Sequence, residues 1–89
     1  MELKELPVNV QIGLTRYVKH HIPPGSFLRA VLENNLSEAV ANADERNLVE
    51  IKKIVQYVYN EVPANCWGSH EVVRKWIVQY NPTTEVPNE

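Results

Sequence analysis

The chain has 89 residues, of which 44% are hydrophobic, and a formal net charge of −2 at pH 7. This composition is typical of one small globular domain and argues against nonspecific binding to nucleic acid, which needs a strongly basic face. No apolar run approaches the roughly 20 residues of a membrane span, and the single cysteine, Cys66, excludes an internal disulfide and favours a reducing cytosol.

Apolar residues at helical spacing, including Val10 and Leu14, predict a first helix over residues 8–21. The pair Pro23–Pro24 ends this helix, because a residue that precedes proline avoids the α region. Gly13 lies inside it, where glycine costs about 1 kcal/mol relative to alanine. This glycine is either a tolerated defect or the place where another backbone approaches closely.

Residues 26–44 form a second apolar region with an interruption near its middle. Asn35 followed by Glu38 resembles a capping box, so a new helix could start there. The pattern therefore predicts either one bent helix or two short ones. Its apolar face consists of Leu28, Val31, Leu32, Leu36, Ala39, Val40 and Ala43.

The clearest helical pattern covers residues 45–62, where apolar residues recur at alternating spacings of three and four. Asp44 is the expected N-cap, and Pro63 ends the helix. We expect the apolar seam to be buried and this helix to lie at the centre of the fold. The seam consists of Leu48, Ile51, Val55, Val58 and Val62, broadened by Ile54 and Tyr59.

A last helix begins after Gly68, with Ser69 as N-cap, and buries Trp76 before Pro82 stops it. Together these segments predict an all-α fold, a compact bundle of four or five short helices. In this interpretation residues 1–81 form a single helical domain, and residues 82–89 form a mobile C-terminal tail.

Two segments of the sequence carry a distinctive pattern. Residues 23–36 read Pro-Pro-Gly-Ser-Phe-Leu-Arg-Ala-Val-Leu-Glu-Asn-Asn-Leu, and residues 59–69 contain Tyr-Asn-Glu-Val-Pro and Cys-Trp-Gly-Ser. With Val73 and Trp76 they resemble a group of small accessory proteins found in tailed bacteriophages and prophages. The resemblance covers residues 13–77 and carries over no functional residue. It implies a phage-encoded accessory protein that acts in the cytoplasm of a bacterial host.

The sequence does not contain a recognisable catalytic or metal-binding set. Cys66 has His70 four residues later as a candidate base, but no third partner is identifiable, and a small buried apolar side chain is the simpler interpretation. The adjacent His20 and His21 lack the paired spacing of zinc ligands. We therefore expect a protein that is not an enzyme and that holds neither a metal nor a cofactor.

The Gly-Ser pairs at residues 25–26 and 68–69 each precede a predicted helix, whose free backbone N–H groups could bind a phosphate. Ordinary helix capping is the alternative. Basic side chains surround the first pair, and an aromatic neighbour could stack on a base. The predicted ligand site consists of Arg16, Lys19, His20, Gly25, Ser26 and Arg29, with Tyr17 or Trp67 as the stacking residue.

Two functions remain open at this stage. The first is a non-enzymatic counter-defence protein that binds and sequesters a small phosphorylated, nucleotide-like ligand, by analogy with small helical phage proteins that sequester nucleotide signals. The alternative is a protein–protein inhibitor or regulator of a host enzyme. For either function we expect a homo-oligomer, because so small a chain exposes much of the apolar surface that it could bury. We expect no membrane partner.

Overall fold

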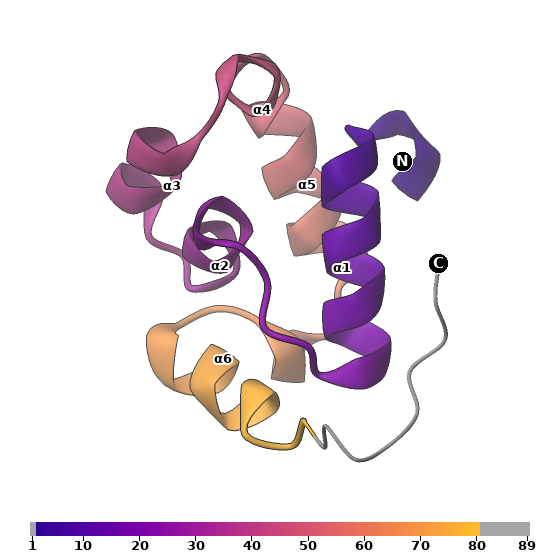
Figure 1. Ribbon diagram of the computed structural model, residues 1–89, viewed down its shortest axis with the longest axis vertical. Coiled ribbons are helices and arrows are strands. Elements are labelled where there is room, and N and C mark those ends of the chain that lie inside the picture. Colours follow the sequence, from indigo (N-terminus) through magenta and orange to yellow (C-terminus); the bar gives the residue numbers. More distant parts are fainter. Residues whose placement is uncertain (1, 81–89) are drawn as a thin grey trace.

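The computed structural model describes residues 2–80, which form six α-helices, two short 3-10 helices and no strand (Figure 1). The all-α fold class is therefore confirmed. The predicted tail, residues 82–89, and the domain end at residue 81 lie outside the described residues. In chain order the elements are η1 (Leu3–Glu5), α1 (Val8–His20), α2 (Ser26–Leu32), α3 (Leu36–Asn42), α4 (Glu45–Val49), α5 (Ile51–Glu61), η2 (Ala64–Cys66) and α6 (His70–Ile77).

Helix α1 begins directly after Pro7 and ends close to where the sequence predicts. It stops because His21 adopts a left-handed conformation, with φ 60°, and donates its backbone N–H to the Tyr17 carbonyl. Residues 22–25 then run back along α1 as an extended segment (Figure 1). As a result α2 starts beside the first half of α1, where Gly25 and Gly13 line the same hollow.

The region 26–44 contains two short helices, which settles the alternative that the sequence left open. Asn34 adopts a left-handed φ of 60° and ends α2. The side chain of Asn35 then accepts a hydrogen bond from the Glu38 backbone N–H at 3.2 Å and caps α3. The Asn34–Asn35 pair thus breaks the helix and restarts it in a new direction.

The single helix expected over residues 45–62 is instead two helices, α4 and α5, which meet at a turn on Glu50. The expected N-cap is confirmed, since Asp44 Oδ1 accepts a hydrogen bond from the Asn47 backbone N–H at 2.7 Å. Because both long apolar regions are interrupted, the described chain has six α-helices rather than four or five.

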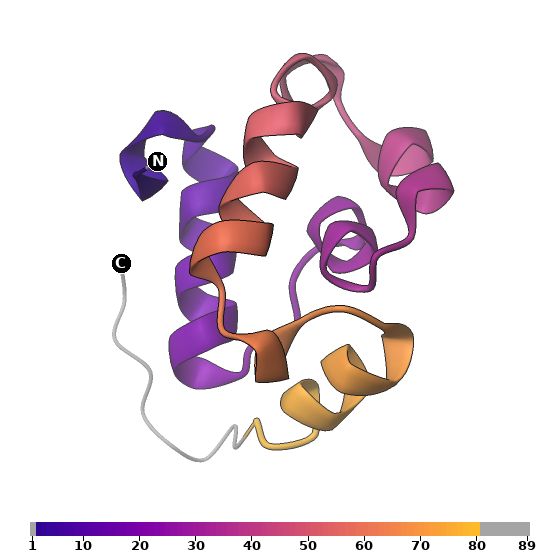
Figure 2. The same cartoon turned by 180° about the vertical axis from the view of Figure 1, so that it is seen from behind.

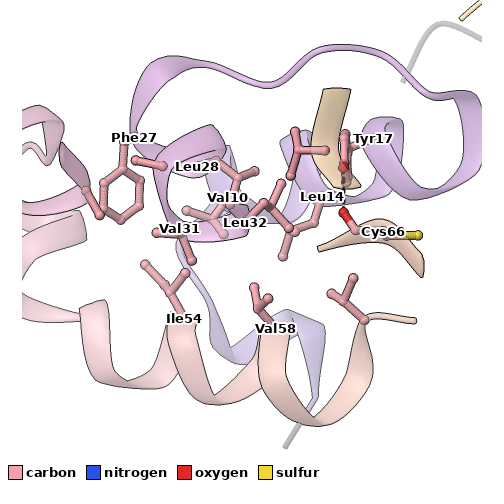
Figure 3. Packing of buried hydrophobic residues seen from close by; sticks show 14 of the residues in the cluster. Val10, Leu14, Tyr17, Phe27, Leu28, Val31, Leu32, Ile54, Val58 and Cys66 are labelled. Atoms are coloured by element: carbon pink, nitrogen blue, oxygen red, sulfur yellow. Dashed lines mark hydrogen bonds between the residues drawn. The ribbon is translucent and has the colours of Figure 1, made fainter. Parts of the chain in front are cut away.

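The centre of the fold is α2, and not the segment 45–62 as the sequence suggested. In both views α5 lies beside α1, while α2 is seen nearly end-on between them and α3 (Figures 1 and 2). Five of the seven residues of α2 are buried. Figure 3 shows Leu28 and Leu32 beside Val10 and Leu14 of α1, and Val31 and Leu32 across from Ile54 and Val58 of α5. The most completely buried side chains of the core are Val10, Tyr17, Leu32, Ile54, Val58, Cys66 and Val73.

Gly13 does meet a close neighbour, but this neighbour is a side chain and not another backbone. A Cβ added at Gly13 would lie 3.0 Å from Cδ2 of Leu28 on α2. The glycine therefore lets α2 pack tightly against α1.

The predicted seam of residues 45–62 is only partly correct. Ile54 and Val58 are buried, but Leu48 and Val55 are 47% and 43% exposed. Tyr59, expected to broaden the buried seam, is exposed as well. The error has a physical cause: α5 is apolar on adjoining faces, and it packs on α1 and α2 with the face that carries Ile54 and Val58.

Helix α6 closes the lower end of the molecule in Figure 1. Ser69 caps it as predicted, because its hydroxyl accepts the Val72 backbone N–H at 3.2 Å. Val73 is fully buried and Trp76 partly so, and the Trp76 indole N–H donates to the Tyr17 carbonyl at 2.7 Å. Within residues 2–80, no helix combines the length and the apolar character that crossing a membrane requires.

Candidate functional site

The structure does not gather the predicted phosphate-binding residues into one site. Gly25 and Ser26 line a hollow beside Asn9 and Gly13 on α1. Lys19 lies six residues beyond Gly13, about 9 Å further along the helix axis, and it lines a different hollow of about 150 Å³ between α1 and α5. Because the chain folds back after α1, the basic end of α1 and the Gly-Ser pair lie apart.

Arg29 forms an ion pair with Glu33, the C-cap residue of the same helix, α2. Its Nε donates to Glu33 Oε2 at 2.9 Å, and the His70 Nδ1 lies 2.9 Å from the same oxygen. Burial alone would raise the pKa of Glu33, but the hydrogen bonds from Arg29 and His70 outweigh it and lower this pKa. The cluster thus joins α2 to the first residue of α6, which is a structural role.

Tyr17 cannot stack on a ligand, so this part of the predicted site is wrong. Its side chain is fully buried, and its hydroxyl donates to the Cys66 carbonyl oxygen at 2.5 Å. Burial also raises the pKa of this hydroxyl well above its usual range. Trp67 is partly exposed, but its ring packs edge-on against Tyr59 with centroids 5.9 Å apart. It lines a hollow that shares no residue with the one beside Ser26.

The interpretation of Cys66 as a small buried side chain is confirmed. Cys66 is fully buried. This burial raises the pKa of its thiol and so disfavours the nucleophilic thiolate. His70, the candidate base, is in contact with Glu33 instead. Within residues 2–80, no three His, Cys, Asp or Glu side chains are grouped so that they could hold a metal ion.

An apolar hollow of about 210 Å³ lies between α3 and α5. Its edges carry exposed apolar side chains from both helices, with Leu36 68% exposed on α3 and Val55 on α5. Trp67 closes one end, with the exposed ring of Tyr59 against it. The residues that line this apolar hollow are Val31, Asn34, Asn35, Leu36, Ala39, Val55, Val58 and Trp67.

A polar hollow of about 400 Å³ lies where the start of α2 meets α1, α3 and α4. It contains an unusual group, because Asn47 is only 4% exposed and its Oδ1 has no hydrogen-bond partner among the described residues. The residues that line this polar hollow are Asn9, Val10, Gly13, Gly25, Ser26, Phe27, Leu28, Asn42, Asp44 and Asn47.

Sequence reasoning missed the apolar hollow, although the sequence carried a signal for it, and it identified only Gly25 and Ser26 of the polar hollow. Leu48 and Val55 belong to the three-four apolar pattern, and their exposure marks a second apolar side of the α4–α5 segment. Asn47 had no such signal, since a polar residue one position before Leu48 is indistinguishable in sequence from a solvated one.

Comparison of the chain with protein-family models, with curated proteins and with solved structures returns no match.

Proposed function

We propose that this chain is a non-enzymatic regulator that binds an apolar helix of a partner protein in the apolar hollow between α3 and α5. One observation carries the proposal: exposed apolar side chains of two helices line this hollow, Leu36 on α3 and Val55 on α5, and the exposed ring of Tyr59 packs against its lining residue Trp67. Exposed apolar side chains that gather around a hollow are typical of protein interaction sites.

The composition of the hollow suits a protein interface. Trp67 and Tyr59, which lie against each other at its end, are of the residue types that dominate binding energy at interfaces. Fully burying an exposed leucine or valine contributes about 1.5–3 kcal/mol. The apolar side chains at this hollow are already partly buried, so each contributes less than this amount, and the aromatic pair supplies a further part of the free energy that offsets the entropic cost of association.

Size and shape favour a partner helix over a small molecule or a second copy of the chain. The volume of about 210 Å³ is below the roughly 300–1,000 Å³ of small-molecule sites, but it accommodates apolar side chains that project from a helix. A two-fold dimer places the same patch against itself. Two facing hollows would leave a void, whereas a convex helix fills one hollow.

The setting of this function follows from the sequence resemblance to phage accessory proteins. On that basis the partner is a host protein in the bacterial cytoplasm, and binding inhibits or redirects it. A phosphorylated, nucleotide-like ligand has less support, because neither lysine nor arginine is among the described residues that line the polar hollow beside Gly25 and Ser26.

The test compares wild-type protein with Val55→Asp, which places a charge on the edge of the apolar hollow. Val8→Asp is the matched control, because Val8 is also exposed and does not line any of the three hollows. Each protein is used to capture partners from bacterial lysate, and helical peptides of any captured protein are then titrated calorimetrically. We expect a peptide that binds the wild type and the control equally and binds Val55→Asp at least tenfold more weakly, a loss of about 1.4 kcal/mol.

Two results would overturn the proposal. One is the absence of any peptide that distinguishes Val55→Asp from Val8→Asp. The other is sedimentation equilibrium in which the wild type is a dimer and Val55→Asp a monomer, because the hollow would then be covered by a second copy of the chain.

A further inference from the structure

We infer that the polar hollow among α1, α2, α3 and α4 is a binding site for a small neutral molecule with neighbouring hydroxyl groups. This site lies apart from the apolar hollow and shares no lining residue with it, so the inference is independent of the proposed function.

The unpaired side chain of Asn47 is the first observation. Its backbone N–H is already used by the Asp44 cap at 2.7 Å, which fixes the residue in place. Its amide oxygen is buried and accepts no hydrogen bond from any residue between 2 and 80. Folded proteins pair almost all buried polar groups, because an unpaired one loses its contact with water without compensation. Asn47 also lines the polar hollow, so a hydroxyl group of a ligand there would satisfy this oxygen once the side chain turns toward it.

The space beside Asn47 is the second observation. The polar hollow, at about 400 Å³, falls within the range of small-molecule sites, roughly 300–1,000 Å³. It is far larger than one water molecule needs. The hollow also has an apolar wall formed by Phe27 and Leu28, so that it combines a dry surface with a few polar groups.

The polar side chains of the hollow indicate the chemistry of the ligand. Asn9 and Asn47 are amides, and an amide offers both a donor and an acceptor, which matches two neighbouring hydroxyls. Asn42 adds an amide oxygen, because its nitrogen already donates to Glu38. Ser26 adds a hydroxyl. The one charged side chain is that of Asp44, and neither lysine nor arginine is among the described residues that line the hollow. A phosphate would therefore face a carboxylate without a compensating cation.

This site retains part of the ligand site expected from the sequence and changes its chemistry. Gly25 and Ser26 belong to it, whereas Arg16, Lys19 and Arg29 do not. The neighbouring hydroxyls of a free sugar and those of the ribose in a nucleoside are chemically equivalent sources of the required groups.

The experiment records amide spectra of ¹⁵N-labelled protein, including the side-chain amide signals of Asn47. D-glucose represents the free sugar, adenosine the ribose of a nucleoside, and inorganic phosphate the anion. We expect saturable shifts of the Asn47 signals with glucose or with adenosine, and the responding probe identifies the source. Phosphate should leave these signals unchanged.

Asn47→Leu removes the unpaired amide and keeps a side chain of similar size. We expect it to weaken binding roughly tenfold, the equivalent of one good hydrogen bond. Its melting temperature should stay equal or rise, because the buried oxygen without a partner is gone. Asn60→Leu, an exposed asparagine outside the hollow, is the matched control and should bind as the wild type does. Asn9→Leu alters an exposed lining residue and serves as a second variant that leaves the core intact.

Three results would overturn the inference. The first is that neither glucose nor adenosine shifts the Asn47 signals up to its solubility limit. The second is that Asn47→Leu and Asn9→Leu both bind as the wild type does. The third is that Asn47→Leu lowers the melting temperature while Asn9→Leu binds normally, which would assign the amide to the fold and not to a ligand.

Discussion

At the scale of single residues, Glu33 makes the stability of the fold depend on pH. Its pKa in the folded protein is lowered from the ordinary value of 4.5. The ionised carboxylate therefore stabilises the fold fully above the unfolded-state pKa, and this contribution is lost as the pH falls through the lower folded-state pKa.

Glu33→Gln should lower the free energy of unfolding by about 1 kcal/mol at pH 7, because it weakens the contacts with Arg29 and His70. Urea unfolding at pH 7 and at pH 3 measures the difference, which should shrink at the lower pH. Glu71→Gln is the control. Its pair with Lys75 is exposed on both sides, so its loss should cost less than about 0.5 kcal/mol. Equal effects of the two substitutions at pH 7 would contradict the prediction.

Gly68 holds the junction between η2 and α6 in a conformation that other residues avoid. Its φ is 126°, and its backbone N–H donates to the Leu32 carbonyl at 2.7 Å. Gly68→Ala should therefore destabilise the fold by about 1–3 kcal/mol, although an added Cβ has free space.

Gly25→Ala is the control that distinguishes backbone strain at a positive φ from the general effect of replacing a glycine. Gly25 has an ordinary φ of −66° and also has free space around an added Cβ. We expect this change to alter the free energy of unfolding by less than about 1 kcal/mol, because restriction of the unfolded chain offsets the poorer capping by alanine at this N-cap position. Thermal unfolding of both variants in one buffer distinguishes them, and a Gly25→Ala variant as unstable as Gly68→Ala would refute the argument.

At the scale of elements, the orientation of α5 can be tested with two neighbouring residues. Ile54 is fully buried, so Ile54→Ala should cost about 2–5 kcal/mol through the cavity that it leaves. Val55 is 43% exposed, and Val55→Ala should change the free energy of unfolding by less than about 1 kcal/mol. Urea denaturation measures both. Similar losses at the two positions would show that α5 is rotated relative to the orientation described above.

Local signals predicted where most helices begin and end. Asn35, Asp44 and Ser69 all act as N-caps, because a short polar side chain can satisfy the free backbone N–H groups of the next turn wherever that helix packs. The buried side of α5 could not be predicted in the same way. Its sequence is apolar on adjoining faces, and only the positions of α1 and α2 decide which face they cover.

At the scale of the whole molecule, the residues of each candidate site are brought together by the course of the backbone and not by their proximity in the sequence. The basic residues of α1 and the Gly-Ser pair are near in sequence, and the sequence alone does not show that residues 22–25 run back along α1. The polar hollow instead joins Asn9 to Asn47, whose proximity arises from packing among four helices. The composition of each hollow was therefore beyond sequence analysis, even where the helix ends were correct.

The hydrogen bond between Trp76 of α6 and Tyr17 of α1 gives a prediction at this scale. Trp76→Phe keeps an aromatic ring beside His21 but removes the indole N–H that donates to the Tyr17 carbonyl at 2.7 Å. The free energy of unfolding should fall by about 1 kcal/mol or more, because one hydrogen bond and part of the ring are lost. Circular dichroism during heating measures the change. A variant as stable as the wild type would mean that this hydrogen bond does not contribute measurably to the stability of the fold.

The same hydrogen bond has a consequence during protein synthesis. Tyr17 and Trp76 are 59 residues apart, and a ribosome that adds about 5–20 residues per second needs roughly 3–12 s to cover this distance. Over that interval the Tyr17 carbonyl lacks its partner on α6, and until Cys66 is added the Tyr17 hydroxyl lacks its partner as well. The part of α1 that packs against Trp76 therefore stays uncovered in the nascent chain until α6 emerges, and a translational pause before residue 76 would prolong its exposure to proteases.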